Sequence, residues 1–122
     1  MNWRKESAAF DRIWYNSTAP PYGNMLAGTW KIEMMTGWIP ALKHHMKHIR
    51  YTGLFSIGKN KTGFQWGEFR VREKQGYSIM EYCRWPIKDE IVEVDIGVLL
   101  GKFYWRGKFK GYFWMTRVEG ES

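Results

Sequence analysis

Apolar and polar residues alternate most regularly in the segment Gly28 to Met34, where a glycine and a threonine lead into a tryptophan. The residues of one parity are Trp30, Ile32 and Met34, and those of the other are Lys31 and Glu33. A period of two is typical of a β-strand that buries one side and exposes the other. The pattern therefore predicts that a β-structure begins with this strand.

Short aromatic-rich segments divided by glycines follow along the rest of the chain. Further strands are predicted over residues 51–57, 64–73, 77–84, 92–98, 103–105 and 108–118. In segment 92–98 the apolar residues recur at every second position, which predicts one wet side. Turns are predicted between the strands, at residues 58–63, 74–76 and 87–90 among others. About seven or eight strands at this spacing favour a mainly β fold, an antiparallel β-barrel or sandwich.

Two segments show helical spacing instead. Phe10, Ile13 and Trp14 form one apolar stripe and predict an N-terminal helix within residues 1–15 that packs on the barrel or covers one end. After the first strand, Pro40 suits a first helical turn, and apolar residues then recur with a helical period to residue 50. The second pattern predicts a short amphipathic helix over residues 40–50, with lysines and an arginine on its polar side.

The composition fits one small domain. The chain has 122 residues and is 44% hydrophobic, which suffices for one core, so we expect a single domain over residues 1–122: a helix and loop over 1–27 and a barrel over 28–119. No apolar run approaches the roughly 20 residues of a membrane span, and the N-terminus lacks the apolar region of a signal peptide. The single Cys83 cannot form an internal disulfide. These features favour a cytoplasmic protein.

The net charge of +7 makes anionic partners plausible. The candidates are nucleic acid, an acidic membrane surface, and ligands with a carboxylate or phosphate group. A basic surface that serves solubility alone is the alternative.

The triplet Gly28-Thr29-Trp30 resembles the first-strand signature of the calycins, the lipocalins and fatty-acid-binding proteins. The predicted helix over residues 40–50 is similar in placement to the helical lid of the fatty-acid-binding proteins. The resemblance implies a barrel in which the tryptophan closes one end and the lid covers an apolar ligand cavity. Arg117 matches an arginine that meets a ligand carboxylate in that family, although Glu119 stands where the family has a tyrosine.

Glu81 is the candidate for an interior carboxylate. It shares parity with Tyr77 and Ile79, and if that side faces inward, burial would raise the pKa of its carboxyl group unless a cation pairs with it. Such a group can act as a general acid or base. The alternative is that Met80 and Tyr82 face inward and Glu81 is in water, and the sequence leaves both arrangements open.

Three histidines, His44, His45 and His48, lie in the predicted lid helix. His44 and His48 are spaced i, i+4, which would place two imidazoles on one helix face where they could share a metal. Without a nearby carboxylate or cysteine ligand they do not define a site, and solvated histidines among lysines are the simpler interpretation. We therefore predict no metal and no cofactor.

The sequence supports three hypotheses for function. The first is binding of a hydrophobic small molecule that carries an acidic group, inside the lidded barrel, and its expected contacts are Trp30, Met34, Trp66, Met80, Trp105, Met115 and Arg117. The second is a metal-free isomerase, cyclase or lyase of a hydrophobic substrate, with Glu81, Tyr82 or His48 transferring protons. The third is a nucleic-acid-binding module that uses the basic and aromatic hairpin over residues 102–112.

Two further partner hypotheses remain open at this stage. The basic helix over residues 40–50, with Trp38 beside it, is compatible with contact to an anionic membrane surface. The oligomeric state is not specified by the sequence, and a dimer is one option.

Overall fold

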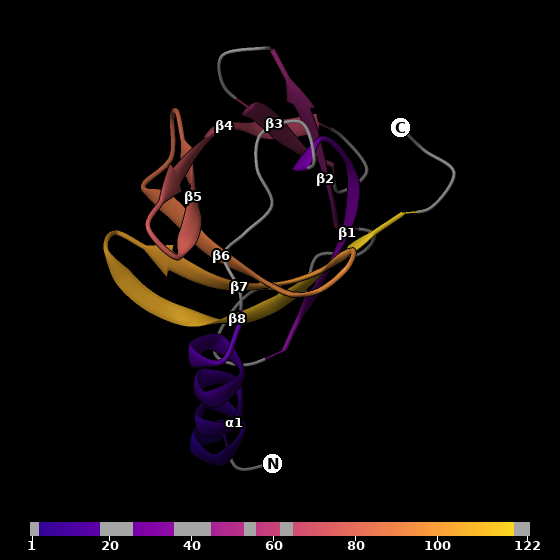
Figure 1. Cartoon of the computed structure of the whole chain (residues 1–122). Helices are drawn as coiled ribbons and strands as arrows, with labels where there is room; N and C mark the ends of the chain where they lie inside the picture. Colours follow the sequence, from indigo (N-terminus) through magenta and orange to yellow (C-terminus); the bar gives the residue numbers. More distant parts are fainter. Residues whose placement is uncertain (1–2, 18–25, 36–44, 53–55, 62–64, 119–122) are drawn as a thin grey trace.

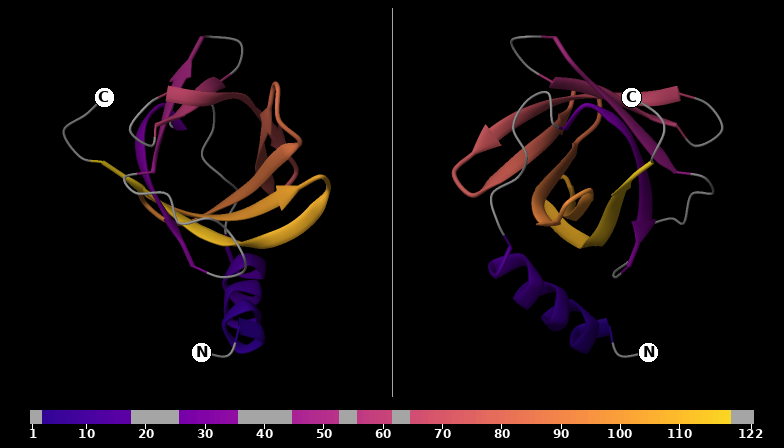
Figure 2. Two further views of the ribbon diagram at one scale, coloured as in Figure 1. Left: turned by 180° about the vertical axis from the view of Figure 1, so that it is seen from behind. Right: turned by 45° about the vertical axis from the view of Figure 1, so that its right-hand side comes forward.

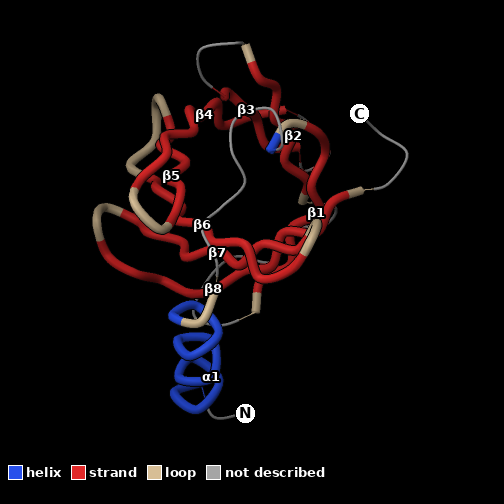
Figure 3. Tube along the Cα trace, viewed as in Figure 1, coloured by secondary structure: helices blue, strands red, loops and turns tan. Residues whose placement is uncertain are grey.

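The chain folds into a closed antiparallel β-barrel with one helix outside it (Figure 1). The computed structural model describes residues 3–17, 26–35, 45–52, 56–61 and 65–118. The elements are α1 (Trp3–Tyr15), β1 (Gly28–Met34), β2 (Met46–Tyr51), β3 (Ser56–Lys61), β4 (Gln65–Lys74), β5 (Tyr77–Tyr82), β6 (Ile87–Asp95), β7 (Val98–Trp105) and β8 (Lys108–Arg117). Each strand pairs with the next, and β1 also pairs with β8, so the eight strands form the ring seen in Figure 3.

The interior of the barrel follows from the alternation in β1. Trp30 and Ile32 are buried and Met34 is partly buried within one core cluster, whereas Lys31 and Glu33 are exposed. The other strands contribute to the same cluster the side chains Ile49, Phe69, Val71, Met80, Ile91, Leu99, Phe113 and Met115. The predicted mainly β class, the barrel and the first strand are therefore confirmed.

Two glycines let aromatic rings pack directly against the barrel backbone. A Cβ atom on Gly101 would lie 2.1 Å from the Phe113 ring, and one on Gly58 would lie 2.4 Å from the Phe69 ring. Both distances are far below van der Waals contact, so side chains at these positions would displace the rings. The two aromatic rings thus fill the space that side chains at the two glycine positions would otherwise occupy.

The N-terminal helix packs against the outer side of the barrel, beside β8 (Figure 2). Phe10, Ile13 and Trp14 contact a small outer cluster that contains Val92, Leu100 and Tyr112. Phe10 stacks on Tyr112 with ring centroids 5.4 Å apart, and the Tyr112 hydroxyl donates a hydrogen bond to Asp11. The predicted helix and its apolar stripe are confirmed. No helix in the described part of the chain is long and apolar enough to cross a bilayer.

The predicted lid helix is wrong where the structure describes it. Residues 46–50 belong to strand β2, and residues 40–44 and Trp38 lie outside the described residues. His45, Lys47 and Ile49 are buried and alternate with more exposed neighbours, which is the period of a strand. Because the inward residue Lys47 is polar, the period of two was not visible in the apolar residues, which by themselves matched a helical spacing. Residues 46–50 therefore form no basic helix that could lie on a membrane surface.

Two predicted turns are also strands. Residues 58–61 belong to β3, and residues 87–90 begin β6, while residues 62–63 lie outside the described residues. The predicted strand over 92–98 is interrupted, because β6 ends at Asp95 and the turn to β7 contains Ile96, which is 93% exposed. Polar residues at inward positions made β3 and the start of β6 resemble turns. Apolar residues in the turn after Asp95 made the predicted strand over 92–98 too long.

Candidate functional site

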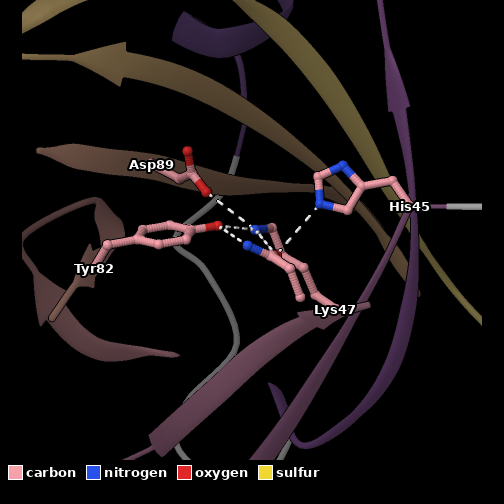
Figure 4. A network of polar contacts seen from close by, with 5 residues as sticks. His45, Lys47, Tyr82 and Asp89 are labelled. Atoms are coloured by element: carbon pink, nitrogen blue, oxygen red, sulfur yellow. Dashed lines mark hydrogen bonds and ion pairs between the residues drawn. The ribbon is translucent and has the colours of Figure 1, made fainter. Parts of the chain in front are cut away.

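Five polar side chains from four parts of the wall converge inside the barrel (Figure 4). Four of them are buried, with exposed fractions of 7% for His45, 2% for Lys47, 0% for Asn60 and 2% for Asp89, and Tyr82 is partly buried. We call these five residues the interior polar cluster. A collection of this kind inside an apolar barrel is costly unless its members satisfy one another.

Lys47 is the centre of the interior polar cluster. Its Nζ atom donates to Asn60 Oδ1 and to the Tyr82 hydroxyl oxygen, both at 2.6 Å, and lies 3.3 Å from Asp89 Oδ2. The Nζ atom is also 4.9 Å from the centroid of the Phe69 ring and 5.2 Å from that of Tyr82. The ammonium group is therefore surrounded by acceptors and ring faces in place of water.

Asn60 links the lysine to the other members. Its Oδ1 atom lies 3.3 Å from His45 Nε2, and its Nδ2 atom donates to the Tyr82 hydroxyl oxygen at 2.6 Å. Because Oδ1 is an acceptor, His45 must carry its proton on Nε2 to complete the bond. The tyrosine oxygen thus accepts hydrogen bonds from both Lys47 and Asn60.

Strand register brings these residues together. Lys47 of β2 lies opposite Asn60 of β3, and Asp89 of β6 lies opposite Met80 of β5, so all point to the interior. Close backbone approach is provided by Gly67 of β4, which has a φ of 65°. A Cβ atom at Gly67 would lie 2.9 Å from the Tyr82 ring and 3.0 Å from Asn60 Nδ2, so the cluster needs a glycine there.

Burial and charge act in opposite directions on the Lys47–Asp89 pair. Burial alone would lower the pKa of Lys47, but Tyr82 and Asp89 beside the ammonium outweigh it and the pKa is raised. Burial raises the pKa of the Asp89 carboxyl group, and the charge of Lys47 opposes that shift. Lysine therefore keeps its proton, and the carboxylate depends on the lysine to remain ionised.

The other two titratable members are held in their neutral forms. Burial, with Lys47 as a second cause, lowers the pKa of His45 to about 4. Burial also raises the pKa of Tyr82 against the opposing effects of Lys47 and Asn60. Burial thus favours the neutral forms of the imidazole and the phenol, whereas the contact between Lys47 and Asp89 favours the charged forms of that pair.

Two buried oxygen atoms on the inner side of β5 and β6 are left without partners. Neither Asp89 Oδ1 nor Ser78 Oγ has a hydrogen-bond partner within the part of the chain that the structure describes. Ser78 is 0% exposed and shares the parity of the interior Met80. Unpaired buried polar atoms are rare in folded proteins, so these two atoms are candidates for a hydrogen bond to water or to a ligand.

Arg117 belongs to a different arrangement, which we call the Trp30–Arg117 stack. The guanidinium carbon of Arg117 lies 4.4 Å from the centroid of the Trp30 ring, and its Nη1 atom donates to the Ala27 carbonyl at 2.8 Å. The Trp30 indole N–H donates to the Leu26 carbonyl at 2.9 Å. One guanidinium N–H group is thus used by the backbone and one face of the guanidinium by the ring, and contact of Arg117 with a ligand carboxylate stays a prediction.

The predicted proton-transfer residues are divided between the two sides of the wall. Tyr82 faces the interior, as part of the cluster. Glu81 lies outside, with 44% of its side chain exposed and paired with Arg72. His48 also lies on the outer side, where its Nδ1 atom is 3.0 Å from Thr29 Oγ1. The interior carboxylate exists, but it is Asp89 and not Glu81, and the interior histidine is His45 and not His48.

Most of the predicted ligand contacts line the interior. Trp30, Met80 and Met115 are buried in the core cluster, and Met34 packs against it. In the β6–β7 register Trp105 lies opposite the buried Ile87, and Phe103 lies opposite Asp89. Trp105 is two residues from Phe103 and therefore lies on the same inner side of the wall. Trp66 lies in β4, and its side chain is outside the described residues.

The basic and aromatic hairpin over residues 102–112 is engaged with the helix. Lys102 Nζ lies 4.4 Å from the centroid of the Trp14 ring, and Tyr112 is 0% exposed beneath α1. Tyr104 donates to Glu90 at 3.0 Å, and burial followed by that carboxylate raises its pKa. Tyr112, which packs against Phe10 and Trp14 of α1, is not free to stack on bases. Phe103 packs against the core cluster on the other side of the wall.

Sequence reasoning missed four of the five cluster members, His45, Lys47, Asn60 and Asp89. The signal for His45 and Lys47 was their shared parity with Ile49. Asn60 and Asp89 gave no comparable signal, because each lay in a predicted turn, where polar residues are ordinary.

Comparisons with protein-family models, with curated proteins and with solved structures found no match to this chain. Within the described ranges no group of three or more His, Cys, Asp and Glu side chains is arranged to hold a metal ion, and His44 lies outside those ranges. The class of protein defined here is therefore a closed eight-stranded antiparallel β-barrel with a charged cluster in its interior.

Proposed function

We propose that the protein binds a small, mainly apolar molecule inside the barrel and places the polar group of that molecule against the interior polar cluster. The observation that carries the proposal is the set of buried polar groups around Lys47 and Asp89, within an interior otherwise lined by aliphatic side chains, methionines and aromatic rings. Binding sites for small molecules combine apolar walls with a few placed polar groups in this way. Eight-stranded barrels are also of a size that holds one small ligand.

We further infer a calycin-like architecture. The support is the Gly28-Thr29-Trp30 triplet at the start of β1, the closure of the barrel by β8, and the position of Arg117 over the Trp30 ring. Likeness of fold does not define a ligand, so the binding proposal rests on the cluster itself.

Binding can be tested with the neutral fluorescent probe N-phenyl-1-naphthylamine and by native mass spectrometry of the purified protein. We expect saturable uptake of one probe per chain, and displacement of the probe by any molecule that copurifies. Met34→Trp adds a ring at a partly buried interior position and should weaken uptake. Ile96→Ser removes an exposed apolar side chain and should leave uptake unchanged. Absence of saturable uptake by folded protein would contradict the proposal, and so would loss of uptake in Ile96→Ser.

An enzymatic function is the second candidate, and the contacts of Tyr82 favour it. A phenol oxygen held 2.6 Å from both Lys47 Nζ and Asn60 Nδ2 can give up its proton to a ligand carbonyl, because both donors stabilise the phenolate that remains. A base must also take a proton from the carbon next to the carbonyl, and Asp89 Oδ1 is the buried acceptor for this step. Return of that proton from Asp89 to another carbon, and of the first proton from the ligand oxygen to Tyr82, would complete an isomerisation without a further reactant.

This second candidate is tested by hydrogen exchange into a bound ketone. A small hydrophobic cyclic ketone in deuterium oxide should gain deuterium next to its carbonyl faster with wild-type protein than with Tyr82→Phe, which keeps the ring. Glu81→Gln, at an outer position, should exchange as fast as wild type. Equal exchange with and without protein would exclude this activity for that class of substrate.

A further inference from the structure

The Asp89 carboxylate uses one of its two oxygen atoms within the cluster. Oδ2 lies 3.3 Å from Lys47 Nζ, whereas Oδ1 has no partner among the residues that the structure describes. Figure 4 shows the second oxygen turned away from the lysine. The side chain is 2% exposed, so bulk water does not compensate Oδ1. A carboxylate oxygen in this position is a strong acceptor that lacks a donor.

Ser78 supplies a second unpartnered oxygen nearby. Ser78 lies opposite Ile91 in the β5–β6 register, and Asp89 lies opposite Met80, so Ser78 and Asp89 are diagonal neighbours on one inner side. Such neighbours are about 7–8 Å apart along a sheet, a distance that one small polar group with its apolar body can bridge. Both atoms can accept a hydrogen bond, and both are buried.

Among the described residues, the two cations that face the interior already have partners. Lys47 is paired with Asp89, and Arg117 donates to the Ala27 carbonyl and covers Trp30. A ligand carboxylate placed against the cluster would add a second buried anion next to Asp89 without a new cation. Such an uncompensated charge is strongly unfavourable in a dry interior.

We propose, on the basis of the binding function above, that the polar group of the ligand is a neutral hydroxyl group that donates a hydrogen bond to Asp89 Oδ1. The ligand class is therefore a hydrophobic alcohol or phenol and not a carboxylic acid. This assignment replaces the acidic group that the sequence suggested, and Ser78 Oγ serves as a second contact for the same hydroxyl or a neighbouring one.

Three probes with the same ring system separate these possibilities in wild-type protein. 1-Naphthol offers a donor, 1-methoxynaphthalene offers an acceptor alone, and 1-naphthoate is an anion. Dissociation constants at neutral pH are measured by isothermal titration calorimetry. We expect 1-naphthol to bind at least about tenfold more tightly than 1-methoxynaphthalene, the size of one well-placed hydrogen bond to a charged group, and 1-naphthoate to bind most weakly.

Variants test the residue assignment. Lys47→Met with Asp89→Leu removes both charges together, so neither is left unpaired, and the affinities for 1-naphthol and 1-methoxynaphthalene should become equal. Ser78→Ala should reduce the preference in part. Glu81→Gln removes an exposed carboxylate charge and should leave the preference unchanged, with folding of each variant checked by circular dichroism.

The outcomes distinguish the two proposals. If none of the three probes binds, the proposed binding function fails, and the hydroxyl assignment fails with it. If 1-naphthoate binds as well as or better than 1-naphthol, or 1-methoxynaphthalene binds equally well, binding stands and the hydroxyl assignment is overturned. Persistence of the 1-naphthol preference in the double variant would show that another group accepts the hydrogen bond.

Discussion

Trp30 and Lys47 lie directly opposite each other on β1 and β2, yet they belong to arrangements of opposite chemistry. In the Trp30–Arg117 stack, the indole N–H and one guanidinium donor reach backbone carbonyls, and the cation covers the ring. In the interior polar cluster, Lys47 reaches side chains of three other strands. The first arrangement joins ring, cation and backbone, whereas the second includes a buried carboxylate oxygen that has no donor among the described residues.

We interpret the first arrangement as structural and the second as the proposed binding site. A buried group whose hydrogen bonds are satisfied locally contributes to the fold and needs no further partner. A buried charge pair with an unused acceptor contributes less to stability than apolar residues of the same volume would, so stability alone does not account for it. We therefore expect substitutions in the stack to affect stability alone and substitutions in the cluster to affect both stability and binding.

Removal of the Lys47 charge should give the largest effect. Lys47→Met leaves Asp89 buried without a cation and should destabilise the protein by about 3 to 5 kcal/mol in urea unfolding. The added substitution Asp89→Leu removes the stranded carboxylate and should restore at least half of that loss. A double variant less stable than Lys47→Met alone would contradict the interpretation of the pair.

Acid should weaken the cluster through His45. Its pKa is about 4 in the folded protein and 6.5 ordinarily, so between these values the unfolded chain binds the additional proton. Stability should therefore fall as the pH falls from about 6.5 to about 4, by about 3 kcal/mol from this group. His45→Gln should lack this component, and since Asp89 is present in both proteins, the difference between their unfolding curves isolates the histidine. If stability depends on pH in the same way in wild type and His45→Gln, the assignment of this component to His45 is wrong.

The Trp30–Arg117 stack should respond more weakly. Arg117→Met keeps an apolar chain over the indole but loses the cation and the bond to Ala27, which should cost about 1 to 2 kcal/mol. Lys108→Met, at an exposed position, serves as the control for loss of a positive charge. Probe binding should be unchanged in both variants, and a loss of 1-naphthol affinity in Arg117→Met would assign this arginine to the ligand site.

The outer ion pair should give the smallest effect. Glu81→Gln breaks the contact with Arg72, but both side chains are about half exposed, so the cost should remain below about 0.5 kcal/mol. Asp89→Asn is the matched change at the interior carboxylate, and thermal unfolding of the two variants compares them directly. A Glu81→Gln protein that loses as much stability as Asp89→Asn would place the important carboxylate on the outer side.

The sequence predicted the parts of the fold whose inward residues are apolar. Strand β1 and helix α1 were predicted because Trp30 and Phe10 begin clear periods of two and of about 3.6 residues. Tyr82 was likewise identified as an inward alternative to Glu81. In these segments, local pattern and tertiary burial agree.

The errors fall on the strands that carry the interior polar cluster. Lys47 lies in a segment predicted as a helix, and Asn60 and Asp89 lie in segments predicted as turns. Each is a polar residue at an inward position, so each breaks the alternation by which a strand is recognised. Their partners come from other strands, and pairing across a barrel depends on register, which the sequence does not display. The sequence did not reveal the cluster because its members are polar residues at inward positions, and such residues are also rare in a barrel interior.

Closure of the ring by β1 and β8 has a consequence for synthesis of the chain. β1 is made first among the strands, but its second neighbour is complete only when Arg117 has been added. Until then β1 carries a row of unpaired backbone groups, which can pair with the same row on another nascent chain. Because this pairing joins the first and last strands, it forms late and slowly compared with the hairpins between them. The backbone edge of β1 is therefore open to pairing with another chain until β8 has left the ribosome.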